Sequence, residues 1–280
     1  MEPVSVIIPC YNVAEYIEET FNSVMGQTYV PDEIVFVNDG STDATLKVLK
    51  IIRAGRDFIK IIDIKNGGVS KARNRGIDSA VNELIFLLDG DDTINSEYIE
   101  RLAKEFHHDS QAILAIGEAQ FFGRTNELWK LPAFDMKKML QRNIIYCGCM
   151  IKKSLWDTAG RFDENLKLRE DWDFFIRYCA LKPEGVKQLP YLGFNYRLRE
   201  DGRDTQLSDH KVLQETNNYI YSKNRHLYFQ YYDDPISLIK QLEKAAWKIQ
   251  LIEKELNFFN KFFFNKVLGR IRKIKNERNR

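Results

Sequence analysis

Three carboxylates surround a glycine where an apolar run ends, in the segment from Leu87 to Asp92 that contains Asp89 and Asp91. So much like charge in one turn costs energy unless a cation neutralises it, and hard divalent cations prefer oxygen ligands. Mn²⁺ or Mg²⁺ held here could bridge phosphate oxygens and stabilise a leaving group. The segment therefore predicts a metal site. The alternative, which applies most to Asp92, is an acidic turn that caps the next helix.

A second acidic group, from Glu170 to Asp173, lies about 80 residues further along and opens a predicted helix. A carboxylate at a helix start that faces a sheet edge can act as a general base toward a hydroxyl group. Acidic residues are also common in the first turn of a helix because they interact favourably with its dipole, and this interpretation applies most to Asp173. Trp172 either stacks on a sugar ring or packs in the core.

Polar residues follow two further apolar runs. Pro9, Tyr11 and Asn12 come at the end of the first run, where a planar base could lodge, although many α/β proteins begin with such a strand. Asp39 ends the second run, and its carboxylate could accept a hydrogen bond from a base or a ribose hydroxyl. Ser41 and Asp43, just beyond it, are explained more simply as turn and capping residues.

A glycine turn at Gly67 and Gly68 leads into a predicted helix that carries Lys71, Arg73 and Arg75. Backbone N–H groups at a helix start, together with cationic side chains, suit an anionic diphosphate. Arg73 and Arg75 cannot both face a ligand from one helix, so one of them is expected to be a surface charge.

Four short apolar runs must position these residues, and they predict strands at 4–8, 34–37, 58–62 and 84–88. Such nearly continuous apolarity is typical of strands covered on both faces, as in a parallel sheet. Amphipathic stretches between the runs predict helices at 14–25, 42–53 and 70–79, the second capped by Ser41 or Thr42. Right-handed crossovers would then bring the carboxyl ends of all four strands to one edge, where open α/β sheets bind ligands.

Beyond Asp92 the pattern loosens and predicts a mixed sheet. The expected elements are helices at 98–106 and 154–159 and strands at 112–116 and 118–122. From about residue 217 the chain becomes helical and aromatic, which places a domain boundary near His210.

Composition limits the class of protein. A net charge of only +2, with 29% charged residues, argues against a nucleic-acid partner, which requires a surface that neutralises many phosphates. The four cysteines form no CxxC pair, the N-terminus does not resemble a signal peptide, and no apolar run approaches the length of a membrane span. We therefore expect a cytoplasmic protein with reduced, packed cysteines.

The chain resembles family 2 glycosyltransferases of the GT-A fold. The resemblance rests on five segments that occur in the order expected for that family: 5–12, 38–43, 67–76, 87–92 and 170–171. The resemblance implies an α/β protein with a Rossmann-like, mixed but mostly parallel sheet flanked by helices. It divides the chain into a catalytic domain, residues 1–210, and a helical C-terminal extension, residues 211–280. Within the catalytic domain, residues 1–92 form the nucleotide-binding half and residues 93–210 the acceptor half.

The resemblance also implies an activity: inverting transfer of a sugar from a nucleotide diphosphate sugar, expected to be a UDP-sugar, to a hydroxyl of a glycan or lipid-linked acceptor. Asp171 would be the general base with Glu170 beside it, Asp91 the chief metal ligand, and Trp172 an acceptor contact. The residues expected at the nucleotide are Pro9, Tyr11, Asn12, Asp39, Lys71, Arg73, Asp89 and Gly90. Bacterial enzymes that build capsule, lipopolysaccharide or glycoprotein glycans are similar in overall plan.

Some features depart from the family pattern. A QxxRW-type motif is not apparent, which argues against processive polymerisation. The segment from Arg203 to Ser208 stands in place of a short Ser-x-Ser phosphate loop. Together with the basic segment from Tyr196 to Arg199, it either closes over the phosphates or is ordinary surface. His210 either completes the metal site or is a surface residue.

Two other functions are alternatives. A sugar-nucleotide nucleotidyltransferase would need a glycine-rich basic loop after its first strand, but residues 9–15 contain no glycine, lysine or arginine. A non-catalytic nucleotide-sugar-binding subunit would have no need to keep Asp91 and Asp171.

The C-terminal tail interleaves aromatic and basic residues between Phe258 and Lys275. Such a segment can lie in the headgroup region of an anionic membrane, which would bring the enzyme to a lipid-linked acceptor. The alternative is that its aromatic residues pack against the catalytic domain or against a second subunit in a homodimer.

Overall fold

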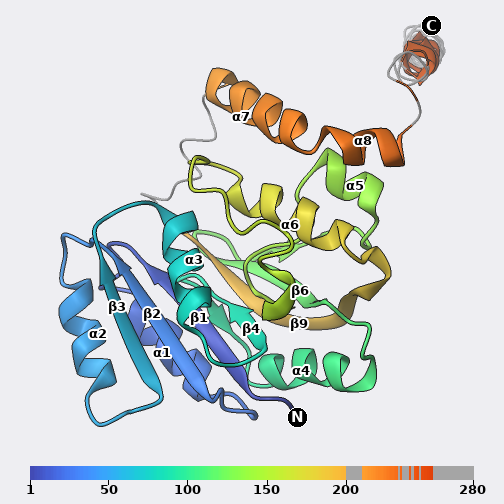
Figure 1. The fold of residues 1–280 in the computed structure, drawn as a ribbon. Coiled ribbons are helices and arrows are strands. Elements are labelled where there is room, and N and C mark those ends of the chain that lie inside the picture. The colour runs from blue at the N-terminus through green and yellow to red at the C-terminus, as the bar shows by residue number, and fades with distance from the viewer. Residues whose placement is uncertain (200–209, 233, 235–239, 241–242, 246, 255–280) are drawn as a thin grey trace, which may run out of the picture. The chain divides into compact units, whose positions relative to one another are not determined.

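Strands β1 (Val4–Cys10), β2 (Glu33–Asp39), β3 (Ile59–Ile64) and β4 (Leu84–Leu87) form the parallel part of a sheet, in the spatial order β3-β2-β1-β4 (Figure 1). The computed structural model describes residues 1–199, 210–232, 234, 240, 243–245 and 247–254. All residues of β1, β2 and β4 are buried, which confirms the prediction of strands covered on both faces for these three. Strand β3 departs from it, because it lies at the edge of the sheet and is only partly buried.

Helices α1 (Ile17–Met25), α2 (Thr45–Arg53) and α3 (Val69–Ser79) connect these strands. Helix α3 packs closely on β1 and β2 because Gly76 has no side chain: a Cβ atom there would lie 2.4 Å from Cγ2 of Ile7. Helix α2 begins three residues later than predicted. The Asp43 carboxylate accepts a hydrogen bond from the backbone of Thr45 at 2.9 Å, whereas Ser41 and Thr42 contact Asn12 instead of capping the helix.

The second half of the sheet is mixed, as predicted. The order continues β4-β8-β6-β9-β5, with β8 antiparallel to β4 and to β6, β9 parallel to β6, and β5 antiparallel to β9. These strands are β5 (Thr93–Ile94), β6 (Leu114–Gly123), β8 (Cys149–Lys152) and β9 (Val186–Leu198), and β7 (Leu128–Trp129) pairs with β6. The helices here are α4 (Tyr98–His108), α5 (Met136–Gln141), α6 (Glu170–Ala180) and the 3₁₀ turns η1 (Lys153–Leu155) and η2 (Pro183–Gly185).

Two expectations for this half were wrong in detail. The two strands predicted at 112–116 and 118–122 are one strand, β6, whose pairing with β9 shifts register between Ile116 and Glu118. Such an irregularity breaks the alternation of side chains, so it looks like an interruption in the sequence. The helix predicted at 154–159 is the single 3₁₀ turn η1 followed by further turns.

Helices α7 (His210–Lys223) and α8 (Arg225–Tyr231) follow, and the chain divides into two units, residues 1–228 and 229–280. The domain boundary after residue 210 stays a prediction. The aromatic and basic tail lies outside the described residues. Within the described ranges, no helix combines the length and apolarity needed to cross a membrane.

The order of the strands determines where a ligand can bind. Strand β1 lies between β2 and β4, so the chain leaves β1 on one side and returns on the other. In open α/β sheets, the crevice at such a switch point is the place where ligands bind, at the carboxyl ends of the strands. The residues after β1 and β4, including Tyr11, Asp89 and Asp91, lie at this edge.

Candidate functional site

Arg73 of α3 joins the two acidic groups identified in the sequence. Its side chain is 2% exposed, and Nη2 donates to both carboxylate oxygens of Asp89 at 2.7 and 3.0 Å, while Nη1 donates to Oε1 of Glu170 at 3.0 Å. Its guanidinium carbon lies 5.4 Å from the centre of the Phe162 ring. One buried cation therefore connects the loop after β4 with the start of α6.

The charge of Arg73 is stable in this position. Burial alone would lower the pKa of Arg73, but the negative charges around it, that of Asp89 first, raise this pKa well above its usual value. Arg75, two residues along α3, is exposed, so the expected division between one inward and one surface arginine is confirmed. Glu170, 4% exposed, is held by the ion pair with Arg73.

Asp171 stands beside this pair in the first turn of α6. Its Oδ2 accepts a hydrogen bond from the Asn143 side chain at 2.8 Å, and its Oδ1 accepts one from the backbone N–H of Trp172 at 2.8 Å. Burial, followed by the negative charge of Glu170, raises the pKa of Asp171 to about 6. A carboxylate with such a pKa is a stronger base than an ordinary aspartate and is still ionised near neutral pH. Asn143 carried no signal in the sequence.

Asp91 and Asp92 have different surroundings although they are adjacent. The Asp91 side chain is 23% exposed, and its Oδ2 lies 3.2 Å from Nη1 of Arg199. Asp92 is 1% exposed, and its Oδ1 accepts a hydrogen bond from the backbone N–H of Arg197 at 2.8 Å. Asp92 thus links the acidic turn to the backbone of β9. It does not cap a helix, since α4 begins after Glu97.

The acidic turn suits a divalent cation. Burial, then the charge of Asp89, raises the pKa of Asp91, and burial with the charges of Asp91 and Asp89 raises that of Asp92 well above its usual value. Oδ2 of Asp92 is buried and has no hydrogen-bond partner among the described residues. The charges of Asp89 and Asp91 thus raise the pKa of neighbouring carboxylates, and the side-chain atoms that could bind a metal ion here are all oxygens. Mg²⁺ and Mn²⁺ take one or two carboxylates together with substrate phosphates, so this donor set fits them.

A closed metal site, by contrast, is not formed within the described part of the chain, where no group of three or more His, Cys, Asp or Glu residues could hold an ion. His210 begins α7 and is exposed, and its proposed part in metal binding stays untested.

The basic segment at the end of β9 contacts the acidic turn directly. Nε of Arg197 donates to the carbonyl oxygen of Asp91 at 2.7 Å, and the guanidinium carbons of Arg197 and Arg199 lie 4.9 and 4.8 Å from the centre of the Tyr16 ring. The sequence left open whether this segment closes over the phosphates or is ordinary surface, and it did not indicate that its arginines would pair with the acidic turn. The segment from Arg203 to Ser208 lies outside the described residues.

Asp39 holds the glycine turn that precedes α3. Its carboxylate is 3% exposed, and its two oxygens accept hydrogen bonds from the backbone N–H groups of Gly67 and Gly68, each at 2.8 Å. The side chain of Lys71 folds closely over this turn. A Cβ atom on Gly67 would lie only 2.3 Å from Cδ of Lys71, so the turn needs a glycine here. Asp39 therefore stabilises the glycine turn, and its contact with a nucleotide stays a prediction.

The residues after β1 differ in their exposure and in their contacts. Tyr11 is 49% exposed, whereas the Asn12 side chain accepts a hydrogen bond from the backbone of Thr42 at 2.8 Å and thereby joins two loops. Gly90 lies so close to the end of β1 that a Cβ atom there would be 3.0 Å from the Pro9 carbonyl oxygen. Pro9, Tyr11, Asn12 and Gly90 thus lie together at one edge of the sheet. Among them, Tyr11 has the exposed ring.

Trp172 is 6% exposed, and its indole N–H donates to the carbonyl oxygen of Met139 at 2.7 Å. Of the two interpretations left open by the sequence, this environment agrees with packing in the core. Its contact with an acceptor stays a prediction.

Comparison with known proteins decides the family. The model of glycosyl transferase family 2 matches residues 5–180, a range that contains every residue discussed above from Pro9 to Trp172. The chain belongs to glycosyltransferase family 2. The prediction of a glycosyltransferase of this family is confirmed.

Relatives of this family-2 chain come from bacteria. It is 26% identical to the chondroitin synthase of Pasteurella multocida over 98% of its own length and 30% of that protein. It is 38% identical to the uncharacterized glycosyltransferase EpsJ of Bacillus subtilis over 69% of this chain and 60% of that protein. The chain thus spans about a third of the length of the synthases it matches.

A solved structure supports the fold of this glycosyltransferase. Residues 1–349 of TarS from S. aureus, crystallised with UDP-GlcNAc, superpose with a TM-score of 0.63 at 20% identity, covering 82% of this chain and 73% of that one. The expected GT-A architecture is therefore confirmed.

The Arg73 bridge leads to a prediction about stability. Arg73→Met leaves Asp89 and Glu170 without their buried cation, and we expect it to lower the free energy of unfolding by about 3–5 kcal/mol in urea denaturation. Arg75→Met, on the exposed side of the same helix, is the matched control and should change little. Equal stability of the two variants would contradict the bridge.

Proposed function

We propose that this protein is an inverting, metal-dependent glycosyltransferase that moves a sugar from a UDP-sugar to a hydroxyl of a glycan or lipid-linked acceptor. The observation that carries the proposal is the placement of Asp91 and Asp171: Arg73 ties their two segments together through Asp89 and Glu170. The UDP-sugar donor is supported by the complexes of TarS with UDP-GlcNAc and with UDP. The glycan acceptor is supported by the names of the chondroitin and hyaluronan synthases.

The two carboxylates of the Glu170-Asp171 pair have different roles. Glu170 is held by Arg73, so its charge is already satisfied. Asp171, with a pKa raised to about 6, accepts the proton of the acceptor hydroxyl. The oxygen of that hydroxyl then forms a bond to the anomeric carbon as the bond from this carbon to the UDP oxygen breaks. A single displacement of this kind inverts the configuration at the anomeric carbon.

The leaving diphosphate requires positive charge. Asp91, with Asp89 beside it, would hold Mn²⁺ or Mg²⁺, which when bound supplies charge to the diphosphate as it departs. Tyr11 offers its ring to the base, and the glycine turn fixed by Asp39 leads into α3, whose N-terminus favours an anionic diphosphate. The side chain of Lys71, in the first turn of α3, covers this glycine turn and can contribute a further cation.

A transfer assay tests the function as a whole. The protein is incubated with a panel of UDP-sugars and glycan acceptors, with and without Mn²⁺, and the products are analysed by mass spectrometry and by NMR of the new linkage. Transfer with inverted anomeric configuration supports the proposal. Nucleotide transfer from UTP to a sugar phosphate would instead identify a nucleotidyltransferase, and donor binding without any transfer would identify a binding subunit.

Asp91→Asn should abolish metal-dependent donor binding while the fold remains, because the amide carries no charge to attract the cation. Calorimetric titration of UDP with and without Mn²⁺ measures this difference directly. The control is Asp78→Asn, an exposed change at the far end of α3. Mn²⁺-dependent binding that survives in Asp91→Asn would refute the metal assignment.

Asp171→Asn should lower kcat by roughly 10²–10⁴-fold and leave the Kd for UDP unchanged, because the base acts on the acceptor. In the wild-type protein, the base must be deprotonated, so we expect kcat/KM to rise with pH and to level off above a pKa of about 6. Steady-state kinetics across this pH range test both statements. If Glu170→Gln reduced kcat more than Asp171→Asn while retaining stability, the roles of the two residues would be exchanged.

A further inference from the structure

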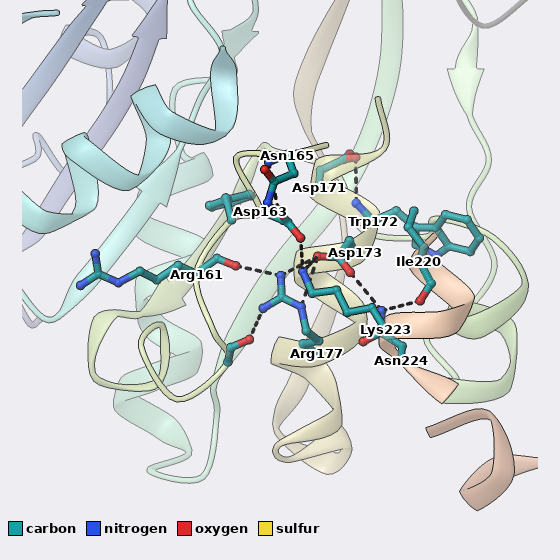
Figure 2. A network of polar contacts seen from close by, with 12 residues as sticks. Arg161, Asp163, Asn165, Asp171, Trp172, Asp173, Arg177, Ile220, Lys223 and Asn224 are labelled. Atoms are coloured by element: carbon teal, nitrogen blue, oxygen red, sulfur yellow. Dashed lines mark hydrogen bonds and ion pairs between the residues drawn. The ribbon is translucent and has the colours of Figure 1, made fainter. Parts of the chain in front are cut away.

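Asp173, two residues beyond the proposed base, is a carboxylate with no exposed surface, and residues of α6 and of the α7 end surround it (Figure 2). Its Oδ2 accepts hydrogen bonds from Arg177 at 2.6 Å and from Lys223 at 2.9 Å. Its Oδ1 accepts one from the Asn224 side chain at 3.0 Å. A buried carboxylate requires such partners, so Lys223 and Asn224 are fixed against the first turns of α6.

Lys223 also reaches the loop that leads into α6. Its Nζ lies 2.6 Å from Oδ2 of Asp163, which in addition accepts a hydrogen bond from the Tyr219 hydroxyl at 2.9 Å. Burial alone would raise the pKa of Asp163, but hydrogen bonds from Lys223, the Asn165 backbone and Tyr219 lower this pKa to about 2. The Lys223 side chain is therefore shared between two carboxylates, Asp163 in the loop and Asp173 in α6.

A third contact holds the residue from which α6 starts. Arg169 has a φ of 59°, in the left-handed region that non-glycine residues seldom adopt. Its Nη1 donates to Oδ1 of Asn217 on α7 at 2.5 Å, and its guanidinium carbon lies 5.4 Å from the centre of the Trp172 ring. Such a conformation persists only where the surroundings enforce it, and α7 supplies one of the enforcing contacts.

The attachment of α7 is mainly polar. Within the described residues of this helix, Ile220 is the buried side chain, so apolar burial is limited to one residue. The contacts instead converge on residues 163–173, the segment that carries Glu170 and Asp171. This convergence points to a role in the site rather than in general stability.

We propose that α7 and the residue that follows it form a brace for the active site, in which Asn217, Lys223 and Asn224 are positioning residues that fix the first turn of α6 and thereby orient Asp171. This inference rests on the proposed function, in which Asp171 is the base. A base must lie within hydrogen-bonding reach of the hydroxyl it deprotonates, and a displacement of about 1 Å can cost a factor of about 100 in rate.

The test compares Lys223→Met and Asn224→Ala with Asn218→Ala, an exposed asparagine on the same helix. For the two brace variants we expect kcat to fall at least tenfold, while the KM for the donor and the Kd for UDP stay within twofold of wild type. Lys223→Arg, which keeps the charge, should recover most of the activity. Hydrogen exchange should be faster at residues 169–174 in the brace variants and unchanged in Asn218→Ala.

A double-mutant cycle separates positioning from general weakening of the fold. If Lys223 acts through Asp171, Lys223→Met should have little effect on the residual rate of Asp171→Asn. Full additivity of the two changes, or unchanged kcat and exchange in both brace variants, would overturn the brace. A wild-type protein that transfers no sugar, while exchange at residues 169–174 still rises in the variants, would overturn the proposed function and leave the mechanical link between α7 and α6 standing.

Discussion

The guanidinium of Arg73 lies inside the protein between Asp89 and Glu170, which come from segments far apart in the chain. Removing three charges from water is costly, and the cost is recovered only if the three side chains meet with good geometry. Helix α3 must therefore lie at a fixed depth on the sheet, and the absence of a side chain at Gly76 permits that depth. The position of the acidic turn relative to α6 follows from this requirement.

The same ion pairs give adjacent carboxylates different properties. Glu170 is paired with Arg73, whereas Asp171 accepts a hydrogen bond from the Asn143 amide, and its burial, followed by the negative charge of Glu170, raises its pKa. A comparable division exists after β4: Asp89 pairs with Arg73, Asp92 is bonded to the backbone of β9, and Asp91, which contacts Arg199, is partly exposed at the edge of the sheet. In both places, the partners rather than the residue type separate structural acids from those available for chemistry.

Contacts distant in sequence also support the site. The first turn of α6 is held by Arg73 of α3 and by Lys223 and Asn224 from the C-terminal side. Figure 2 shows that the contacts of α7 and of the loop before α6 converge around Asp173. The carboxylate that we propose as the base is thus held by contacts on both sides of its helix, which limits its movement.

The sequence by itself determined the four parallel strands, the helices between them, and the polar residues at the strand ends, because apolar runs and glycine turns are local signals. It also predicted the family and the acidic segments at Asp91 and Asp171. Only the tertiary structure decided that Arg73 bridges the two segments, that Asn143 contacts Asp171, and that the Trp172 ring is buried. These contacts join residues that no periodicity relates, and β8 and β9 escaped prediction because their neighbours in the sheet, not their own residues, define them.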